Sequence, residues 1–229
     1  MSDKFEHDLP IRMVTVWDLP IRIFHWLISF NVIFLLVTGN IGGDWILWHI
    51  RAAYLLSGLI IFRILWGIKG SYYARFSSFI VSPIKGFTYL KQIFSGEAEP
   101  HYQHNPAGAL MVLVLMIALS TQFLAGTVIT DDIMWYGPFY QWVSGALAEM
   151  GTALHHQMEW VLIGLVILHI AAVMFHQFWL KEKIIQAMIH GKKHRQEQSA
   201  KPVVVNRLVL IGILVLSGIW VYWLWGLPI

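Results

Sequence analysis

Five long apolar runs, separated by polar segments, set the pattern of this chain. Each is close to the roughly 20 residues that a helix needs to cross the hydrocarbon core of a bilayer. We therefore predict membrane-crossing helices over residues 21–38, 48–67, 106–129, 154–178 and 207–225. Asp18 and Pro20 stand where a helix cap and an early helical proline are expected, just before the first run. Residues 83–95 mix apolar residues with lysines and predict a short helix at the membrane interface.

The composition indicates an all-α integral membrane protein, not a soluble domain. The 229 residues are 57% hydrophobic and 13% charged. We divide them into a polar lead (1–20), a four-helix region (21–178), a basic connection (179–206) and a C-terminal transmembrane helix (207–229). The chain has no cysteine, which excludes disulfides, covalent haem attachment through CxxCH and cysteine-ligated iron–sulfur clusters.

Lysine and arginine cluster in alternate segments, and this pattern predicts the orientation of the helices. They occupy the lead and the connections at 68–105 and 179–206, whereas the loop at 130–153 has none and only Arg51 lies towards its side. By the positive-inside rule, the chain crosses the membrane five times, with a cytoplasmic N-terminus and a periplasmic C-terminus. The net charge of +3 then reflects topology and not nucleic-acid binding. A four-crossing alternative, with the last segment at the interface, stays open.

Four histidines lie within the apolar runs or at their ends, where an ionisable side chain is costly and indicates function. His155 and His169 are 14 residues apart, so a helix places them within roughly 40° on one face and about 21 Å apart along its axis. His25 lies at the depth of His169, and His49 at the depth of His155. Each pair is a candidate set of axial ligands for one of two stacked haem irons: His25 with His169, and His49 with His155. Two imidazoles fill both axial positions, which favours electron transfer over oxygen chemistry.

The remaining histidines have weaker claims as ligands. His156 competes with His155 but points about 100° away on a helix, and His176, seven residues after His169, is a rival cytoplasmic ligand. The others are interpreted as loop or solvated residues: His7, His101, His104, His190 and His194. Small residues near the ligands would let a flat macrocycle approach the backbone: Ala53, Gly58 and Gly164.

Several pieces of the sequence resemble the bacterial cytochrome b561 family, in particular its nickel–iron hydrogenase cytochrome b subunit type. They are VWDLPIRIFHW (16–26), WHIRAAYLLSGLIIFRILWG (48–67), ARFSSFIVSP (74–83), HNPAG (104–108) and LHHQMEWVLIGLVILHI (154–170). The resemblance implies a four-helix core with two b haems, electron exchange with the quinone pool, and ligands at the positions of His25, His49, His155 and His169. The chain departs from the family pattern at His156, at Ala53 and in its fifth helix.

We expect a dihaem electron-transfer subunit of a respiratory oxidoreductase in the bacterial inner membrane. It would pass electrons between quinone in the lipid and a periplasmic redox protein, such as a hydrogenase small subunit or a c-type cytochrome. The aromatic loop at 130–153 and the turn at 39–48 would form the outer docking face, and the quinone site is expected near His25 and residues 74–85. Three arginines either pair with haem propionates or are simple interfacial anchors: Arg22, Arg51 and Arg75.

Two other functions stay open at this point. A stand-alone superoxide oxidase that passes electrons to quinone would need a cationic outer site, and Arg51 is the only lysine or arginine there. A haem-free transporter or metal-binding protein would use the histidines to relay protons or bind a cation. Such proteins usually carry intramembrane carboxylates, and Glu159 is the only acidic residue well inside a predicted helix.

Overall fold

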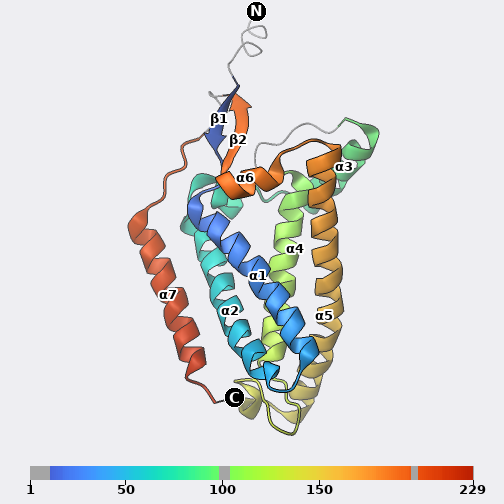
Figure 1. Ribbon diagram of the computed structural model, residues 1–229, viewed down its shortest axis with the longest axis vertical. Coiled ribbons are helices and arrows are strands. Elements are labelled where there is room, and N and C mark those ends of the chain that lie inside the picture. The colour runs from blue at the N-terminus through green and yellow to red at the C-terminus, as the bar shows by residue number, and fades with distance from the viewer. Residues whose placement is uncertain (1–10, 98–103, 197–200, 229) are drawn as a thin grey trace, which may run out of the picture. The chain divides into compact units, whose positions relative to one another are not determined.

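The computed structural model describes residues 11–97, 104–196 and 201–228, which form seven α-helices and two short strands within those ranges (Figure 1). The long helices are α1 (Leu19–Ile41), α2 (Trp45–Lys69), α4 (Pro106–Gly126), α5 (Gly145–Met174) and α7 (Arg207–Trp225). The shorter elements are α3 (Pro83–Ser95), α6 (Ile184–His190), β1 (Ile11–Thr15), β2 (Lys192–Gln196), the 3-10 turns Tyr72–Ala74, Phe76–Ser78 and Tyr140–Trp142, and the π-helix Phe175–Trp179. Two basic residues of the lead are affected by these gaps: Lys4 lies outside the described residues, and so does the side chain of Arg12. His7 and His101 also lie outside them, as does the side chain of His194.

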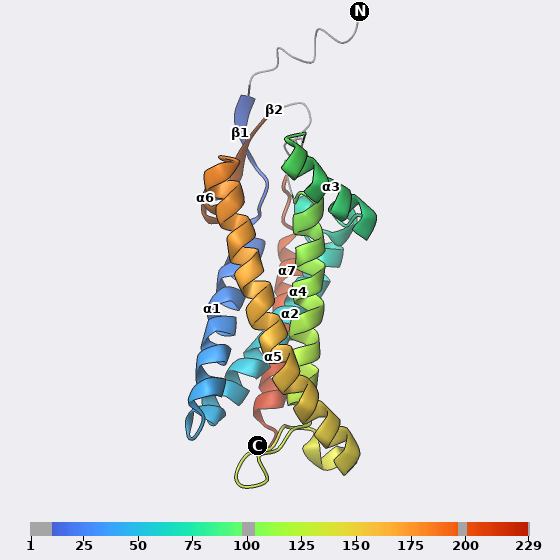
Figure 2. The ribbon, with the colours of Figure 1, turned by 90° about the vertical axis from the view of Figure 1, so that its right-hand side faces the viewer.

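Five helices are long and apolar enough to cross a membrane: α1, α2, α4, α5 with its π-helical end, and α7 (Figure 2). This confirms the predicted all-α membrane fold. Many of their large apolar side chains are exposed, including Phe30 at 68%, Trp160 at 73% and Leu208 at 82%. Such surfaces are unusual in soluble proteins, and they suit contact with lipid tails.

The helix boundaries agree with the sequence prediction at most positions. Helices α3 and α7 have the predicted bounds, and Asp18 caps α1, because its Oδ1 atom accepts a 2.7 Å hydrogen bond from the amide of Ile21. The largest difference is α5, which begins at Gly145, well before the predicted start at residue 154. Its first turns contain Glu149, Gly151 and Thr152, so they continue the helix without continuing the apolar run. The strand pair β1–β2 and helix α6 were not predicted.

The structure divides into two compact units. Unit 1 comprises Met1–Ile23, Trp66–Met111 and Ile170–Leu210, as far as these residues are described. Its strands pair antiparallel from Ile11↔Gln196 to Thr15↔Lys192. Asp18 is almost fully buried, and its Oδ2 atom accepts hydrogen bonds from Trp66 Nε1 (3.0 Å) and from the hydroxyl of Ser71. The Asp18 carboxylate thus joins the start of α1 to the end of α2.

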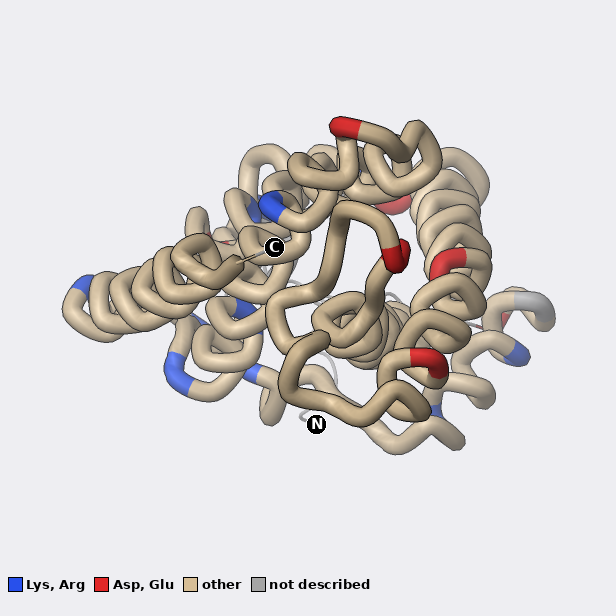
Figure 3. The backbone as a smooth tube through the Cα atoms, turned by 90° about the horizontal axis from the view of Figure 1, so that it is seen from below, with Lys and Arg blue, Asp and Glu red and all other residues tan. Residues whose placement is uncertain are grey.

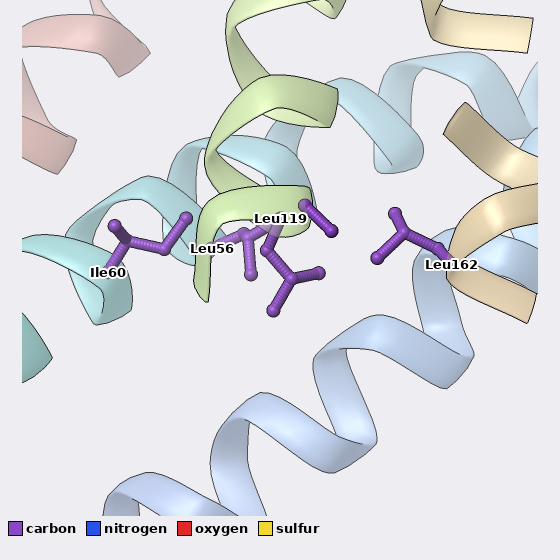
Figure 4. Packing of buried hydrophobic residues seen from close by; sticks show 5 residues of the cluster. Leu56, Ile60, Leu119 and Leu162 are labelled. Atoms are coloured by element: carbon purple, nitrogen blue, oxygen red, sulfur yellow. The ribbon is translucent and has the colours of Figure 1, made fainter. Parts of the chain in front are cut away.

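Unit 2 comprises Phe24–Leu65, Val112–His169 and Ile211–Ile229, again within the described residues. Its core is a buried apolar cluster contributed by three helices (Figure 4): Leu56 and Ile60 of α2, Ala118 and Leu119 of α4, and Leu162 of α5. Partly buried residues of α1 pack against this cluster: Ile28, Val32 and Leu35. Segments of α1, α2, α4 and α5 therefore share one core.

Helix α7 also packs within unit 2, against α2. Trp220 Nε1 donates a 3.0 Å hydrogen bond to Ser57 Oγ. A Cβ atom at Gly58 would overlap the side chain of Val221. The small residue at Gly58 therefore makes room for α7, which corrects the expectation that it borders a macrocycle.

Candidate haem-binding site

All four predicted ligands lie in unit 2, and the structure brings them together in the predicted pairs. The ring centres of His25 (α1) and His169 (α5) are 6.4 Å apart. Those of His49 (α2) and His155 (α5) are 6.2 Å apart. No direct hydrogen bond joins the rings of either pair in the described part of the chain. Helix α5 supplies one member of each pair, as the 14-residue spacing predicts.

The spacing of the rings fits a metal atom bound between them. A metal–imidazole nitrogen bond is about 2 Å long, and the nitrogen lies roughly 1 Å from the ring centre. Two imidazoles on opposite sides of one iron therefore have centres about 6 Å apart, close to both observed values. Among the described residues, no group of three or more His, Asp or Glu side chains could hold a bare metal ion. Two facing imidazoles without further ligands suit a macrocycle that supplies the other four nitrogens.

The imidazole of His49 is fixed by a main-chain hydrogen bond from another helix. Its Nδ1 atom donates to the carbonyl oxygen of Leu35 in α1 at 3.0 Å, with Thr38 Oγ1 3.4 Å away. Because a carbonyl only accepts, Nδ1 carries the proton and Nε2 is left with a free lone pair. Histidines that bind metals are held in this way, through a hydrogen bond from the nitrogen that does not bind the metal.

His155 repeats this arrangement on the opposite side of its pair. Its Nδ1 atom donates a 3.0 Å hydrogen bond to the carbonyl oxygen of Gln122 in α4. His25 differs, because its Nδ1 atom is buried without a hydrogen-bond partner among the described residues. The two pairs therefore share their ring spacing, but His25 lacks the main-chain hydrogen bond that His49 and His155 each make.

The two rival histidines are placed differently. His156 is exposed on α5 beside His155. His176 is buried in the π-helix of unit 1, where its Nδ1 atom donates to Glu182 Oε2 at 3.1 Å and its Nε2 atom accepts from Asn105 Nδ2 at 3.4 Å. Both ring nitrogens of His176 are thus engaged. Burial raises the pKa of the neighbouring Tyr89 to about 12, and the charge of Glu182 adds to this rise.

The three candidate propionate-binding arginines all hydrogen-bond to main-chain carbonyls. Arg22 donates to Ile189 and Arg75 to Gly70 (3.0 Å), both within unit 1. In unit 2, Arg51 donates to the carbonyl of Trp225 at 2.9 Å, and its guanidinium lies 4.4 Å from the centre of the Trp225 ring. A guanidinium has five donors, so propionate pairing stays a prediction for each of them.

Two features of unit 2 were not predicted from the sequence. Asn40 of α1 donates a 2.8 Å hydrogen bond to Glu159 of α5, one turn beyond His155. The loop between α4 and α5 is folded onto the end of α4, since the Phe139 amide donates to the Thr127 carbonyl at 2.8 Å.

Residues 130–153 carry Asp131, Asp132 and Glu149 but no lysine or arginine. Figure 3 views the backbone from this end, with acidic positions in red.

Comparisons with known proteins show the family of the chain. The prokaryotic cytochrome b561 family matches residues 16–191. A protein of Bradyrhizobium diazoefficiens named "Probable Ni/Fe-hydrogenase B-type cytochrome subunit" is 25% identical over 219 residues, covering 79% of this chain and 85% of the relative. Proteins with the same name from Rhodobacter capsulatus (24% identical; 79% of this chain, 81% of the relative) and Rhizobium leguminosarum bv. viciae (23%; 80% and 89%) are also similar. The family match spans most of the chain, and the chain therefore belongs to the prokaryotic cytochrome b561 family of membrane b-type cytochromes that transfer electrons.

Proposed function

We propose that this chain is a dihaem cytochrome that passes electrons between the quinone pool and a redox protein at the periplasmic surface. The observation that carries the proposal is the pair of facing imidazoles at each of two levels along α5. His25 with His169, and His49 with His155, would hold one haem b each. Each haem would carry one electron at a time. Two such carriers, about 21 Å apart along α5, would connect the two membrane surfaces.

The residues of the chain itself hold and orient these carriers. His49 and His155 present bare Nε2 atoms because Leu35 and Gln122 take up their Nδ1 protons. The buried cluster of Leu56, Leu119 and Leu162 keeps water out of the middle of unit 2. Two imidazoles would hold each haem, and a haem held in this way would supply electron transfer in preference to oxygen chemistry.

Charge distribution supports an orientation with the N-terminus in the cytoplasm and the C-terminus in the periplasm. The connections at 68–105 and 179–206 are rich in lysine and arginine, and the 130–153 loop has none. In this orientation four crossings return the chain to the cytoplasm, and α7 then takes the C-terminus to the periplasm. A reporter enzyme that is active only in the periplasm, fused after residue 229, should be active. The same reporter fused after residue 200 should be silent, and the reverse pattern would contradict this orientation.

The periplasmic partner we propose is a hydrogenase, because the similar proteins are named as hydrogenase cytochrome subunits. It would meet the 130–153 loop and the 39–48 turn, which both belong to unit 2. Quinone would exchange electrons at the level of the His25–His169 pair. These assignments place the two electron exits at opposite ends of α5.

Reduction by quinol tests the proposal directly. The purified protein in liposomes should show a b-type α-band after addition of a quinol, without any other reductant. In His49→Ala, the quinol should still reduce the haem that remains. In His25→Ala, the quinol should reduce the remaining haem far more slowly. His156→Ala is the matched control, because that exposed histidine adjoins His155. A wild-type protein that carries haem but is reduced by no quinol would contradict quinone exchange.

A further inference from the structure

Two glycines occupy equivalent places beside His49 and His155. A Cβ atom built on Gly39 would lie 3.0 Å from His49 Cε1 and 3.1 Å from its Nδ1 atom. A Cβ atom on Gly126 would lie 2.9 Å from His155 Cε1 and 3.1 Å from its Nδ1 atom. Among the glycines that the structure describes, only these two have an imidazole as their nearest neighbour.

Each glycine follows, by four residues, the carbonyl that its histidine binds. His49 donates to Leu35, four residues before Gly39, and His155 donates to Gln122, four residues before Gly126. In an α-helix, positions i and i+4 lie one above the other on the same face. The Cε1–Nδ1 edge of the imidazole therefore lies against the helix where the missing side chain leaves the carbonyl accessible. The same contact, which we call a seat, occurs twice: α1 provides it for His49 of α2, and α4 provides it for His155 of α5.

We propose that Gly39 and Gly126 are positioning residues that seat the two imidazoles of the His49–His155 pair and direct their Nε2 atoms towards one haem iron. This inference rests on the proposed dihaem function. The hydrogen bond from Nδ1 to a carbonyl makes each imidazole a stronger electron donor. A stronger donor stabilises the oxidised iron, so the haem of this pair has the lower reduction potential. The His25–His169 pair has no such seat at His25, whose Nδ1 atom is buried without a partner among the described residues.

Substitution of each glycine by alanine tests the inference. The added methyl group would press on the edge of the imidazole at 2.9–3.1 Å, so the ring must shift, and this shift would weaken its bond to the carbonyl. Loss of such an outer-shell partner lowers metal affinity about 10–100-fold, so Gly39→Ala and Gly126→Ala should each weaken retention of the same haem. In protein that still holds this haem, its midpoint potential should rise, and the potential of the other haem should stay unchanged. His49→Ala identifies the affected component in the redox titration.

Gly218→Ala is the matched control, because Gly218 lies inside α7 and a Cβ atom there has no neighbour within 4 Å. Retention of the haem at His25 and His169 serves as an internal measure of folding. Haem retention and potentials in the Gly39 and Gly126 variants equal to those of Gly218→Ala would overturn the inference. Loss of both haems together would also overturn it, because the glycines would then support the fold and not one seat. A wild-type protein with fewer than two haems would instead contradict the proposed function.

Discussion

Asn40 of α1 donates a 2.8 Å hydrogen bond to Glu159 of α5. Asn40 directly follows Gly39, and Glu159 lies one helical turn after His155. The bond therefore joins two helices beside the His49–His155 pair, and it places a carboxylate there. A negative charge near an iron stabilises the oxidised form, which carries one more positive charge.

Removal of this charge should change the potential of one haem only. Glu159→Gln keeps the size of the side chain and an oxygen that can accept from Asn40, but it loses the negative charge. We expect the midpoint potential of the haem at His49 and His155 to rise by on the order of tens of millivolts, since about 59 mV corresponds to a tenfold change for one electron. Potentiometric titration of the α-band measures this change.

Glu149→Gln is the control for that experiment, because Glu149 is an exposed residue of the same helix. It should shift neither potential. An equal shift of both haems after Glu159→Gln would show that the charge acts over the whole protein and would contradict a local role.

His176 should be dispensable for haem binding. Its two ring nitrogens are engaged by Glu182 and Asn105, so His176→Leu should retain both haems. The loss of these hydrogen bonds should lower the free energy of unfolding by about 1 kcal/mol, measured by thermal unfolding in detergent. His169→Ala, by contrast, should lose one haem. If His176→Leu lost a haem and His169→Ala lost none, His176 and not His169 would be the haem ligand.

The packing of α7 on α2 should depend on Ser57 and Gly58. Ser57→Ala removes the hydrogen bond from Trp220 and should weaken the helix pair by about 0.5–2 kcal/mol, as for other polar contacts between membrane helices. Gly58→Leu should have the larger effect, because its side chain would overlap Val221. Faster proteolysis of the 201–206 segment in detergent would report release of α7. Proteolysis at the wild-type rate in Gly58→Leu would show that this contact does not hold the helix.

The loop between α4 and α5 should depend on the charge of Asp131. Its Oδ1 atom accepts from the amides of Trp135 (2.8 Å), Met134 (2.9 Å) and Ile133 (3.1 Å), and these hydrogen bonds lower the pKa of the carboxyl group. A lowered pKa means that the charged form favours the folded loop. The stabilisation is complete above the unfolded pKa of 3.8 and is lost as the pH falls through the lower folded value.

Hydrogen exchange of the 133–135 amides at neutral pH tests this account. Exchange should be much faster in Asp131→Ala, whereas Asp131→Asn retains an acceptor oxygen and should show an intermediate rate. Equal rates in Asp131→Ala and the wild type would show that the carboxylate does not order the loop.

The sequence was sufficient to predict the membrane helices, because a transmembrane helix is specified by a local property, the length of an apolar run. Helix α7 has the predicted bounds, whereas the start of α5 was placed too late because residues 145–153 are helical without being strongly apolar. The pairing of β1 with β2 joins segments far apart in the chain. Because β2 is polar and highly charged, it lacks the alternation of apolar and polar residues that predicts a strand.

The histidine pairs were also predictable, because the 14-residue spacing on α5 and the matched depths on the other helices are properties of single helices. The contacts of Gly39 with His49 and of Gly126 with His155 were not predictable. They depend on how α1 is rotated against α2, and α4 against α5, which no single helix specifies. The role of Gly58 was misassigned for the same reason, since only the packing of α7 brings Val221 against it.

A haem count on the purified protein tests the central claim most directly. We expect a b-type spectrum with two haems per chain by pyridine haemochrome. His25→Ala and His169→Ala should each lose one haem, and His49→Ala and His155→Ala should each lose the other, with distinct potentials for the two haems that remain. A single haem per wild-type chain would contradict the paired arrangement, and so would a His25→Ala variant that lost the same haem as His49→Ala.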